Sequence, residues 1–253
     1  MDVRETAVLG AGPAGLTAAW TALRYGEITI YSIKKRSAQH GAQYLHNPIP
    51  LANDREPHGT INNYFIGTPQ GYRDKVYGTD LVASDTSFAN MPERQPAWDL
   101  RRTYEWLWDR LEHRIVDTPV HAGLLEGSIQ RGETVISSVP ADAICMVPEK
   151  HQFQAYTVGI TPVDPVDDEH FVVYNGDPSV PWYRWSQVFG YGQVEWPLSV
   201  APDEAVAVKK PVYNNCSCWL PVHRVGRYGR WRKGVLVDDV VGAVDRIFAG
   251  ESP

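Results

Sequence analysis

The spacing of three glycines near the start of this 253-residue chain could bind a diphosphate. Residues 10–15 read GAGPAG, which fits the pattern G-x-G-x-x-G. In that pattern the first glycine permits a tight turn, the second lets a diphosphate approach the backbone, and the third lets a helix pack against a strand. The residues expected to hold the diphosphate are Gly10, Ala11, Gly12, Pro13, Ala14 and Gly15.

The elements around this turn give the pattern its meaning. The short apolar run 6–9 predicts a buried strand, residues 16–23 are compatible with a helix, and the β-branched segment 27–32 predicts a second strand. Strand, turn, helix and strand in this order form a βαβ unit with parallel strands. We therefore interpret the turn as a dinucleotide-binding site; a tight turn without a ligand is the alternative.

Basic residues follow the second predicted strand, where a site of this kind carries an acid that binds ribose. Here that position is Ser32 or Lys34, and Lys35 and Arg36 follow. The basic residues could accommodate the extra phosphate of NADP. Alternatively, Lys35 or Arg36 reaches the diphosphate or stacks on adenine, or the segment is a solvated turn. Ser32, Lys34 and Arg36 are therefore candidate cofactor-binding residues.

Two arginines lie among aromatic and basic neighbours. Arg184 belongs to the segment WYRW and Arg227 begins the segment RYGRWR. A guanidinium group binds phosphate or carboxylate through two hydrogen bonds, and it also stacks on aromatic rings. Both arginines are therefore candidates for binding an anionic substrate or cofactor phosphates, and cation–π packing of a small β-layer is the alternative.

The cysteines and histidines give little sign of a metal site. Cys216 and Cys218 are separated by one residue, unlike the usual C-x-x-C, and on a strand both would point to one side. The eight histidines show no H-x-x-x-H or H-E-x-x-H spacing, so we expect no metal. No G-x-S-x-G motif supports serine hydrolysis.

The rest of the chain supplies the elements that must position these groups. Residues 37–96 show few periodic runs, whereas apolar residues recur every three or four positions over 98–115 and predict a helix there. Further elements are strands over 134–139 and 212–220, β-like patterns over 152–195, and a last helix over 238–249 with Asp238 as its N-cap. This order predicts an α/β fold with a Rossmann-like domain and a small β-rich layer.

The composition is that of an ordinary globular protein, with 43% hydrophobic and 21% charged residues. A net charge of −6 gives no general attraction to nucleic acid or anionic membranes. The longest uncharged apolar stretch, residues 7–23, is interrupted by glycines and a proline, so we expect no transmembrane span. No basic segment precedes an apolar core, and we expect no signal peptide and a cytoplasmic location.

Several segments in the same order resemble UDP-galactopyranose mutase and its relatives in the amine-oxidase-like FAD superfamily. The GAGPAG turn is shared by that whole superfamily, and residues 40–46 (HGAQYLH) resemble a mutase segment that ends in a histidine beside the flavin. The other similar segments are TVISSVPADAI at 134–144, the run from 173 to 197 with VYN, PWYR and EWP, and GRYG at 226–229.

The resemblance implies a glutathione-reductase-type Rossmann domain with FAD extended along the glycine turn and its ring between residues 40–46 and the C-terminal segment. The last helix would point its N-terminus at the flavin, where residues 234–237 would stabilise a reduced, anionic ring by up to about 1–2 kcal/mol. The further residues expected at the cofactor are Gly41, Ala42, Gln43, Tyr44, Val116, Gly226, Arg227, Gly234, Val235 and Leu236.

His46 would lie near the flavin, where an imidazole can hydrogen-bond N5 or a substrate. A loop histidine packed for structural reasons is the alternative. His46, Arg184 and Arg227 are thus the candidate catalytic residues.

The chain also departs from the mutases. It is much shorter, mainly between His46 and Thr134, where the mutases carry a helical domain that holds UDP. A tyrosine and an acid of the mutase C-terminal segment correspond to Lys233 and Val235 here. The mutase activity is therefore not expected to carry over.

Three functions compete on this basis. The first is an FAD-dependent oxidoreductase acting on a small polar or anionic substrate. The second is a redox-neutral, mutase-like enzyme in which reduced flavin N5 attacks an anomeric carbon. The third is a non-catalytic FAD- or nucleotide-binding module that works with a partner chain. The candidate partners are NAD(P)H or another electron donor, a second copy of the chain, and a partner subunit. We expect no binding to nucleic acid or to membranes.

The predicted domain division follows the same resemblance. Residues 1–48, 98–150 and 222–253 are assigned to the FAD-binding domain. Residues 49–97 form a loop-rich insertion, and residues 151–221 form a small β-rich region over the substrate.

Overall fold

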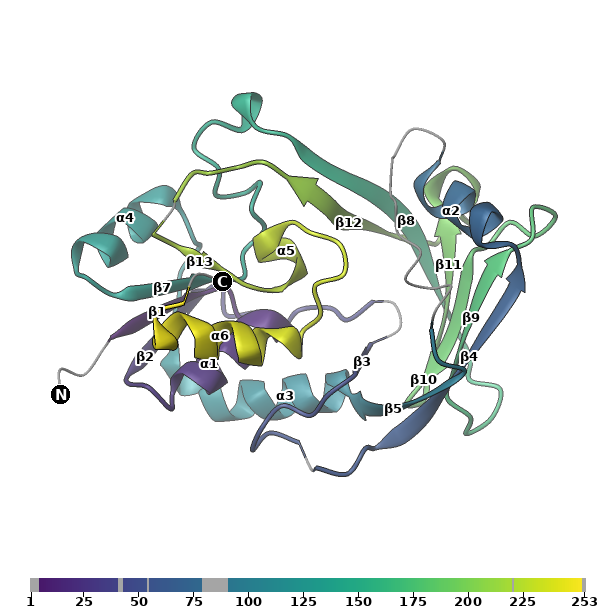
Figure 1. Cartoon of the computed structure of the whole chain (residues 1–253), viewed down its shortest axis with the longest axis horizontal. Helices are drawn as coiled ribbons and strands as arrows, with labels where there is room; N and C mark the ends of the chain where they lie inside the picture. The colour runs from purple at the N-terminus through teal and green to yellow at the C-terminus, as the bar shows by residue number, and fades with distance from the viewer. Residues whose placement is uncertain (1–4, 41–42, 54, 79–90, 220, 252–253) are drawn as a thin grey trace.

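The computed structural model contains two sheets, which lie on opposite sides of the molecule (Figure 1). It describes residues 5–40, 43–53, 55–78, 91–219 and 221–251. One sheet has five strands and carries helices on both faces, and the other has eight strands and curls beside it. Gly41 and Ala42, expected at the cofactor, lie outside the described residues. Within the described ranges, no helix has the length and apolar character needed to cross a membrane.

The five-stranded sheet is parallel throughout and has the order β13-β7-β1-β2-β6. This is the Rossmann arrangement, in which β1 lies at the centre and the strand order reverses beside it. The strands predicted over 6–9, 27–32 and 134–139 are confirmed. Its strands are β1 (Thr6–Leu9), β2 (Ile28–Ser32), β6 (Ile115–Asp117), β7 (Thr134–Ser137) and β13 (His223–Arg224).

Helices cover both faces of this sheet. The helices α1 (Pro13–Ala22), α3 (Leu100–Leu111) and α6 (Asp239–Ala249) pack on one face, and α4 (Ala122–Gln130) packs on the other. The helix predicted over 98–115 is shorter than expected, because the Asp99 side chain caps it at one end and a 3-10 turn, η2 (Glu112–Arg114), begins after Leu111. The last helix is confirmed within one residue.

The second sheet has the order β12-β8-β11-β10-β9-β4-β5-β3 and is antiparallel except where β4 meets β9. The helix α2 (Pro69–Tyr77) packs against it, mainly on β9. Its strands are β3 (Tyr44–Leu45), β4 (Gly59–Gly67), β5 (Arg94–Asp99), β8 (Phe153–Val163), β9 (Phe171–Gly176), β10 (Arg184–Val188), β11 (Tyr191–Pro197) and β12 (Val206–Asn214).

Two sequence-based expectations about this sheet are wrong. The described part of segment 49–97 is not loop-rich, because β4, α2 and most of β5 lie in it. β4 pairs with the distant strand β9, β5 pairs with β4, and α2 packs on β9. The strand expected over 212–220 instead covers 206–214 as β12, at the edge of the sheet, where a proline is tolerated. Cys216 and Cys218 therefore lie in the loop after β12 and not on one side of a strand.

The turn between β1 and α1 is as tight as its glycines suggest. Gly10 has a φ of +96°, which favours glycine. A Cβ at Gly15 would lie 1.9 Å from the Gly10 carbonyl oxygen, whereas a Cβ at Gly12 would meet only the Ser37 hydroxyl at 3.5 Å. Gly10 and Gly15 are thus required by the fold itself, and Gly12 is not.

We expect Gly15→Ala to destabilise the protein by about 1–3 kcal/mol, because the added methyl must push apart packed backbone. The matched control is Gly12→Ala, which causes no backbone clash and should lower the unfolding midpoint less, by only the modest cost of alanine at a helix N-cap. Equal unfolding midpoints for the two variants would contradict this account of the turn.

Candidate functional site

The glycine turn leaves the N-terminus of α1 open. Gly12 is the N-cap residue, no side chain caps the helix, and its first turn contains no acidic residue. Two hydroxyls hold the turn in place: that of Tyr104 donates to the Ala11 carbonyl oxygen (3.1 Å) and that of Ser138 to the Leu9 carbonyl oxygen (3.1 Å). The backbone N–H groups of a helix start without a capping side chain form a general anion site.

The basic residues after β2 pair with acids and so fit the solvated-turn alternative. Lys34 Nζ lies 3.3 Å from the Glu112 carboxylate, and Arg36 pairs with Asp109 and lies over the Trp108 ring. All four charged side chains are more than a third exposed. Ser32, the last residue of β2, lies opposite Asp117 on β6, which brings a carboxylate to this edge from a neighbouring strand.

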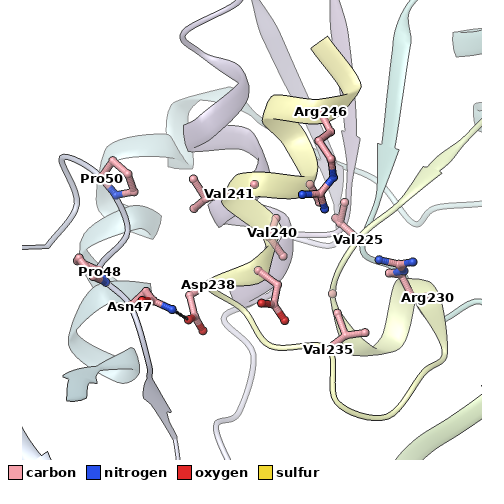
Figure 2. Close-up of a pocket in the computed structure, with 14 residues that line it drawn as sticks. Asn47, Pro48, Pro50, Val225, Arg230, Val235, Asp238, Val240, Val241 and Arg246 are labelled. Carbon is pink, nitrogen blue, oxygen red and sulfur yellow. Dashed lines mark hydrogen bonds between the residues drawn. The ribbon is translucent and has the colours of Figure 1, made fainter. Parts of the chain in front are cut away.

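A cavity of about 450 Å³ lies between residues 47–50 and the C-terminal segment (Figure 2). The short helix α5 (Gly226–Arg230) and the start of α6 form one wall. Two residues expected at the cofactor, Gly226 and Val235, line it, and the 44–46 segment leads directly into the opposite wall. Lining residues include Asn47, Pro48, Gly226, Arg230, Val235 and Asp238.

Asp238 has a half-satisfied carboxylate in this cavity. The residue is 8% exposed, and its Oδ2 accepts a hydrogen bond from Asn47 Nδ2 at 3.0 Å (Figure 2). Its Oδ1 is buried and has no partner among the described residues. Asp238 is the N-cap residue of α6, as the sequence predicted, but its side chain makes no capping hydrogen bond. A buried carboxylate oxygen without a donor is costly, and a ligand that donates to it would remove that cost.

Close contact between α5 and α1 joins the two halves of the expected site. Gly226 has a φ of +69°, and a Cβ there would lie 2.4 Å from the Ala14 Cβ. Gly234 also has positive φ (+76°), and Leu236 donates its backbone N–H to the Asp239 carboxylate (2.7 Å).

Val116 lies apart from this group. It is an exposed residue of the edge strand β6, opposite Tyr31, and it is not among the residues that line the cavity. Its expected role at the cofactor therefore gains no support from the cavity.

Tyr44 connects the cavity with the eight-stranded sheet. Its hydroxyl accepts a hydrogen bond from Gln95 Nε2 at 2.7 Å, and the neighbouring Gln43 amide donates to the His40 carbonyl oxygen. Burial raises the pKa of Tyr44. The positive charge of Arg184 lowers this pKa, and the negative charge of Asp238 raises it. His46 is half-buried, with its ring centroid 4.9 Å from that of Tyr44.

Arg184 belongs to a buried ionic network. It lies opposite Glu195 on the β10–β11 hairpin, and its Nε donates to Glu195 Oε1 at 2.8 Å. The Tyr183 hydroxyl donates to Glu195 Oε2 at 2.6 Å, and Lys210 Nζ also donates to Oε2. Burial alone would raise the pKa of Glu195, but Arg184 and Lys210 outweigh it and hold this pKa at about 2.

Arg184 and Lys210 share this one carboxylate, and the charge of a third cation, Arg227, acts on Lys210. Burial lowers the pKa of Lys210 to about 7, opposed by Glu195 and assisted by Arg184 and Arg227. Arg227 reaches from α5 to the sheet, where its Nη2 donates to the Pro211 carbonyl oxygen at 3.2 Å. Sequence reasoning missed Lys210 and the carboxylate role of Glu195. The hairpin turn at 189–190 could have paired positions 184 and 195, but nothing local points to Lys210.

We expect Glu195→Gln to cost about 3–5 kcal/mol, because it leaves a buried guanidinium without its counter-charge. Since the folded pKa of Glu195 is depressed to about 2, its contribution to stability is present above the ordinary carboxyl pKa and is lost as pH falls toward 2. The control is Asp142→Asn, which breaks the more exposed pair with Lys209 and should cost less than about 1 kcal/mol in urea unfolding. Similar costs for both variants would refute the buried network as a source of stability.

No protein-family model matches the sequence, and no curated protein matches it. Solved structures are similar in three dimensions. Reduced UDP-galactopyranose mutase is 11% identical, with 100% of this chain and 95% of that chain covered and a TM-score of 0.54.

An oxygenase and a halogenase are also similar. The tetrameric form of 2-methyl-3-hydroxypyridine-5-carboxylic acid oxygenase is 14% identical, with 97% of this chain and 86% of that chain covered and a TM-score of 0.55. MibH, a tryptophan 5-halogenase, is 10% identical, with 98% and 66% covered and a TM-score of 0.57. At these identities the likeness concerns the fold, and it confirms the α/β, Rossmann-like fold and the mutase resemblance that the sequence predicted.

Proposed function

We propose that this chain is an FAD-dependent oxidoreductase whose substrate is a small anion. The observation that carries the proposal is the cavity between residues 47–50 and α6, with the buried, half-satisfied carboxylate of Asp238 in its wall. Bound there, a flavin would supply hydride exchange with a substrate C–H bond, and the protein would position the reactants.

The glycine turn fits the diphosphate of such a cofactor. Packing within the chain does not require a glycine at position 12, because a Cβ would meet only the Ser37 hydroxyl at 3.5 Å. The space beside Gly12 is therefore available to a ligand, next to a helix N-terminus that lacks a capping side chain. Gly10, Gly15 and the Ala14–Gly226 contact hold that space in shape.

Asp238 fits the polar chain that joins a flavin ring to its diphosphate. The ribityl chain carries hydroxyl groups, and one hydroxyl donated to Asp238 Oδ1 would complete the hydrogen bonding of this carboxylate. Asn47 already holds the other oxygen and thus fixes the direction in which Oδ1 points.

The charges near the sheet favour an anionic substrate. Arg184 and Lys210 share the single carboxylate of Glu195, the charge of Arg227 also acts on Lys210, and the Arg184 side chain keeps 21% of its surface exposed. A carboxylate or phosphate on the substrate would offset the excess positive charge. His46, whose ring lies beside that of Tyr44 and which directly precedes Asn47 in the cavity wall, is the proposed acid–base group.

A redox-neutral mutase reaction receives no such support. Lys233 and Val235 stand where the mutase resemblance places a tyrosine and an acid. Lys233 packs its ammonium 4.1 Å from the centre of the Tyr77 ring, and Val235 lines the cavity. Neither residue reproduces the hydroxyl or the carboxylate of the mutases.

Titration of the purified chain with FAD, followed by flavin fluorescence, tests the cofactor. We expect Gly12→Val to weaken FAD binding at least about tenfold, since its side chain fills the space of the diphosphate. His46→Ala is the comparison variant and should bind FAD as the wild type does. Undiminished FAD binding by Gly12→Val would remove the turn from the cofactor site.

The affinity for benzoate, measured by calorimetry at pH 6 and pH 8, tests the anion proposal. The pKa of Lys210 is about 7, so its ammonium is protonated at the lower pH and mostly neutral at the higher one. We expect binding to weaken about tenfold between the two values. Lys210→Met should abolish the pH dependence, and neutral benzamide should show none. Equal benzoate affinities at both pH values in the wild type would argue against Lys210 as an anion ligand.

A further inference from the structure

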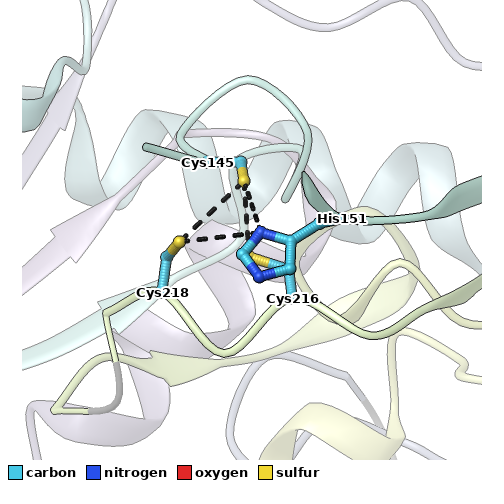
Figure 3. A group of neighbouring side chains, drawn as sticks. All are labelled: Cys145, His151, Cys216 and Cys218. Atoms are coloured by element: carbon cyan, nitrogen blue, oxygen red, sulfur yellow. Dashed lines mark hydrogen bonds between the residues drawn. The ribbon is translucent and has the colours of Figure 1, made fainter. Parts of the chain in front are cut away.

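Four metal-ligating side chains meet outside the proposed flavin site. Cys145, His151, Cys216 and Cys218 direct their ligand atoms toward one another, and these atoms all lie within 4.8 Å (Figure 3). Cys145 Sγ lies 3.2 Å from His151 Nδ1, 3.6 Å from Cys216 Sγ and 3.9 Å from Cys218 Sγ. Cys218 Sγ lies 3.8 Å from the same imidazole nitrogen.

Four of the six separations are close to the edges of a tetrahedron around one ion, and the other two, from Cys216 to His151 and to Cys218, do not exceed 4.8 Å. Zinc binds cysteine sulfur at about 2.3 Å and histidine nitrogen at about 2.0–2.1 Å. A regular tetrahedron with those radii has sulfur–sulfur edges of about 3.8 Å and sulfur–nitrogen edges of about 3.6 Å. The observed distances scatter around both values. They are also far longer than the bond of about 2.05 Å in a disulfide.

The fold brings the four ligands together from two loops. The strands β8 and β12 pair with Phe153 opposite Asn214, so the residues just before β8 meet those just after β12. The Gln152 backbone N–H donates to the Asn215 side chain at 2.8 Å, which fixes the two strand ends beside His151 and Cys216. Cys145 comes from the loop after β7 and approaches from the Rossmann layer.

The surroundings suit thiolate ligands. Arg224 Nη2 lies 3.4 Å from Cys216 Sγ and donates to the Cys218 carbonyl oxygen at 2.8 Å. The sulfur of Cys145 accepts a backbone hydrogen bond from Val147, and that of Cys216 accepts one from Cys218. Hydrogen bonds of this kind orient metal ligands and stabilise their charge.

We propose that these residues bind one zinc ion in a closed Cys3His site with a structural role. Three sulfurs and one nitrogen in a tetrahedral set favour zinc, and four protein ligands leave no open position for catalysis. The ion would tie the β8–β12 ribbon to the Rossmann layer and anchor the loop that leads through β13 to α5. The sequence predicted no metal because the ligands lie at positions 145, 151, 216 and 218 and form no local motif.

Elemental analysis of the purified full-length chain tests the site. We expect about one zinc ion per chain, lost in Cys145→Ser and in His151→Ala. The control is His113→Ala, because His113 is an exposed histidine away from the cluster, and it should keep the full zinc content. A zinc content unchanged by both ligand substitutions, or iron in place of zinc, would overturn the proposal.

Cobalt substitution decides the question even if the ligand variants fail to fold. The wild-type chain, stripped of metal by a chelator and loaded with Co²⁺, should show the intense visible absorption of tetrahedral, thiolate-bound cobalt. It should also unfold at lower temperature after chelation and recover on addition of zinc. A weak octahedral cobalt spectrum, or a disulfide between two of the cysteines in freshly purified protein, would disprove the site.

Discussion

The closeness of backbone to backbone at the start of α1 is the constraint on which the candidate site depends. Gly15 sits against the Gly10 carbonyl oxygen, and Gly226 sits against Ala14, with no room for a Cβ on either glycine. The first contact brings α1 onto β1, and the second brings α5 onto α1. Because the chain continues from α5 into α6, these two contacts also place Asp238 beside Asn47. The close packing at Gly15 and Gly226 thus determines where Asp238 lies in the candidate site.

A buried charge imposes the second constraint. Glu195 has no exposed surface, and its carboxylate is stable only because Arg184, Tyr183 and Lys210 all reach it. One partner comes from each of β10 and β12, and the third precedes β10, so the network joins β10 and β11 to β12 across the intervening strand β8. Arg184, a member of this network, also lies close enough to Tyr44 for its charge to act on that hydroxyl.

The sequence allowed the local helices and strands to be predicted. It did not allow prediction of the strand pairs and ion pairs that join residues far apart in the chain. β1, α1, β2 and α6 follow from apolar periodicity, glycines and a helix stop, all read within a few residues. Segment 49–97 looked like loop because β4 is stabilised by pairing with β9, more than a hundred residues away, and β5 in turn pairs with β4. Lys34 and Arg36 looked like phosphate ligands because their acidic partners lie on α3 and η2. Similarly, Lys210 and the cysteine cluster become visible only once β8 and β12 are paired.

A β-bulge inside β12 divides this strand into two parts that pair with β8 in different registers. The register shifts between Pro211 and Tyr213, with Lys210 on one side of the shift and the cysteine loop on the other. Side chains alternate between the faces of a strand, so adding or removing one residue before Lys210 would turn its ammonium to the opposite face. The same change beyond the bulge would leave that alternation untouched. Adding or removing one residue before Lys210 would therefore remove its ammonium from the Glu195 carboxylate.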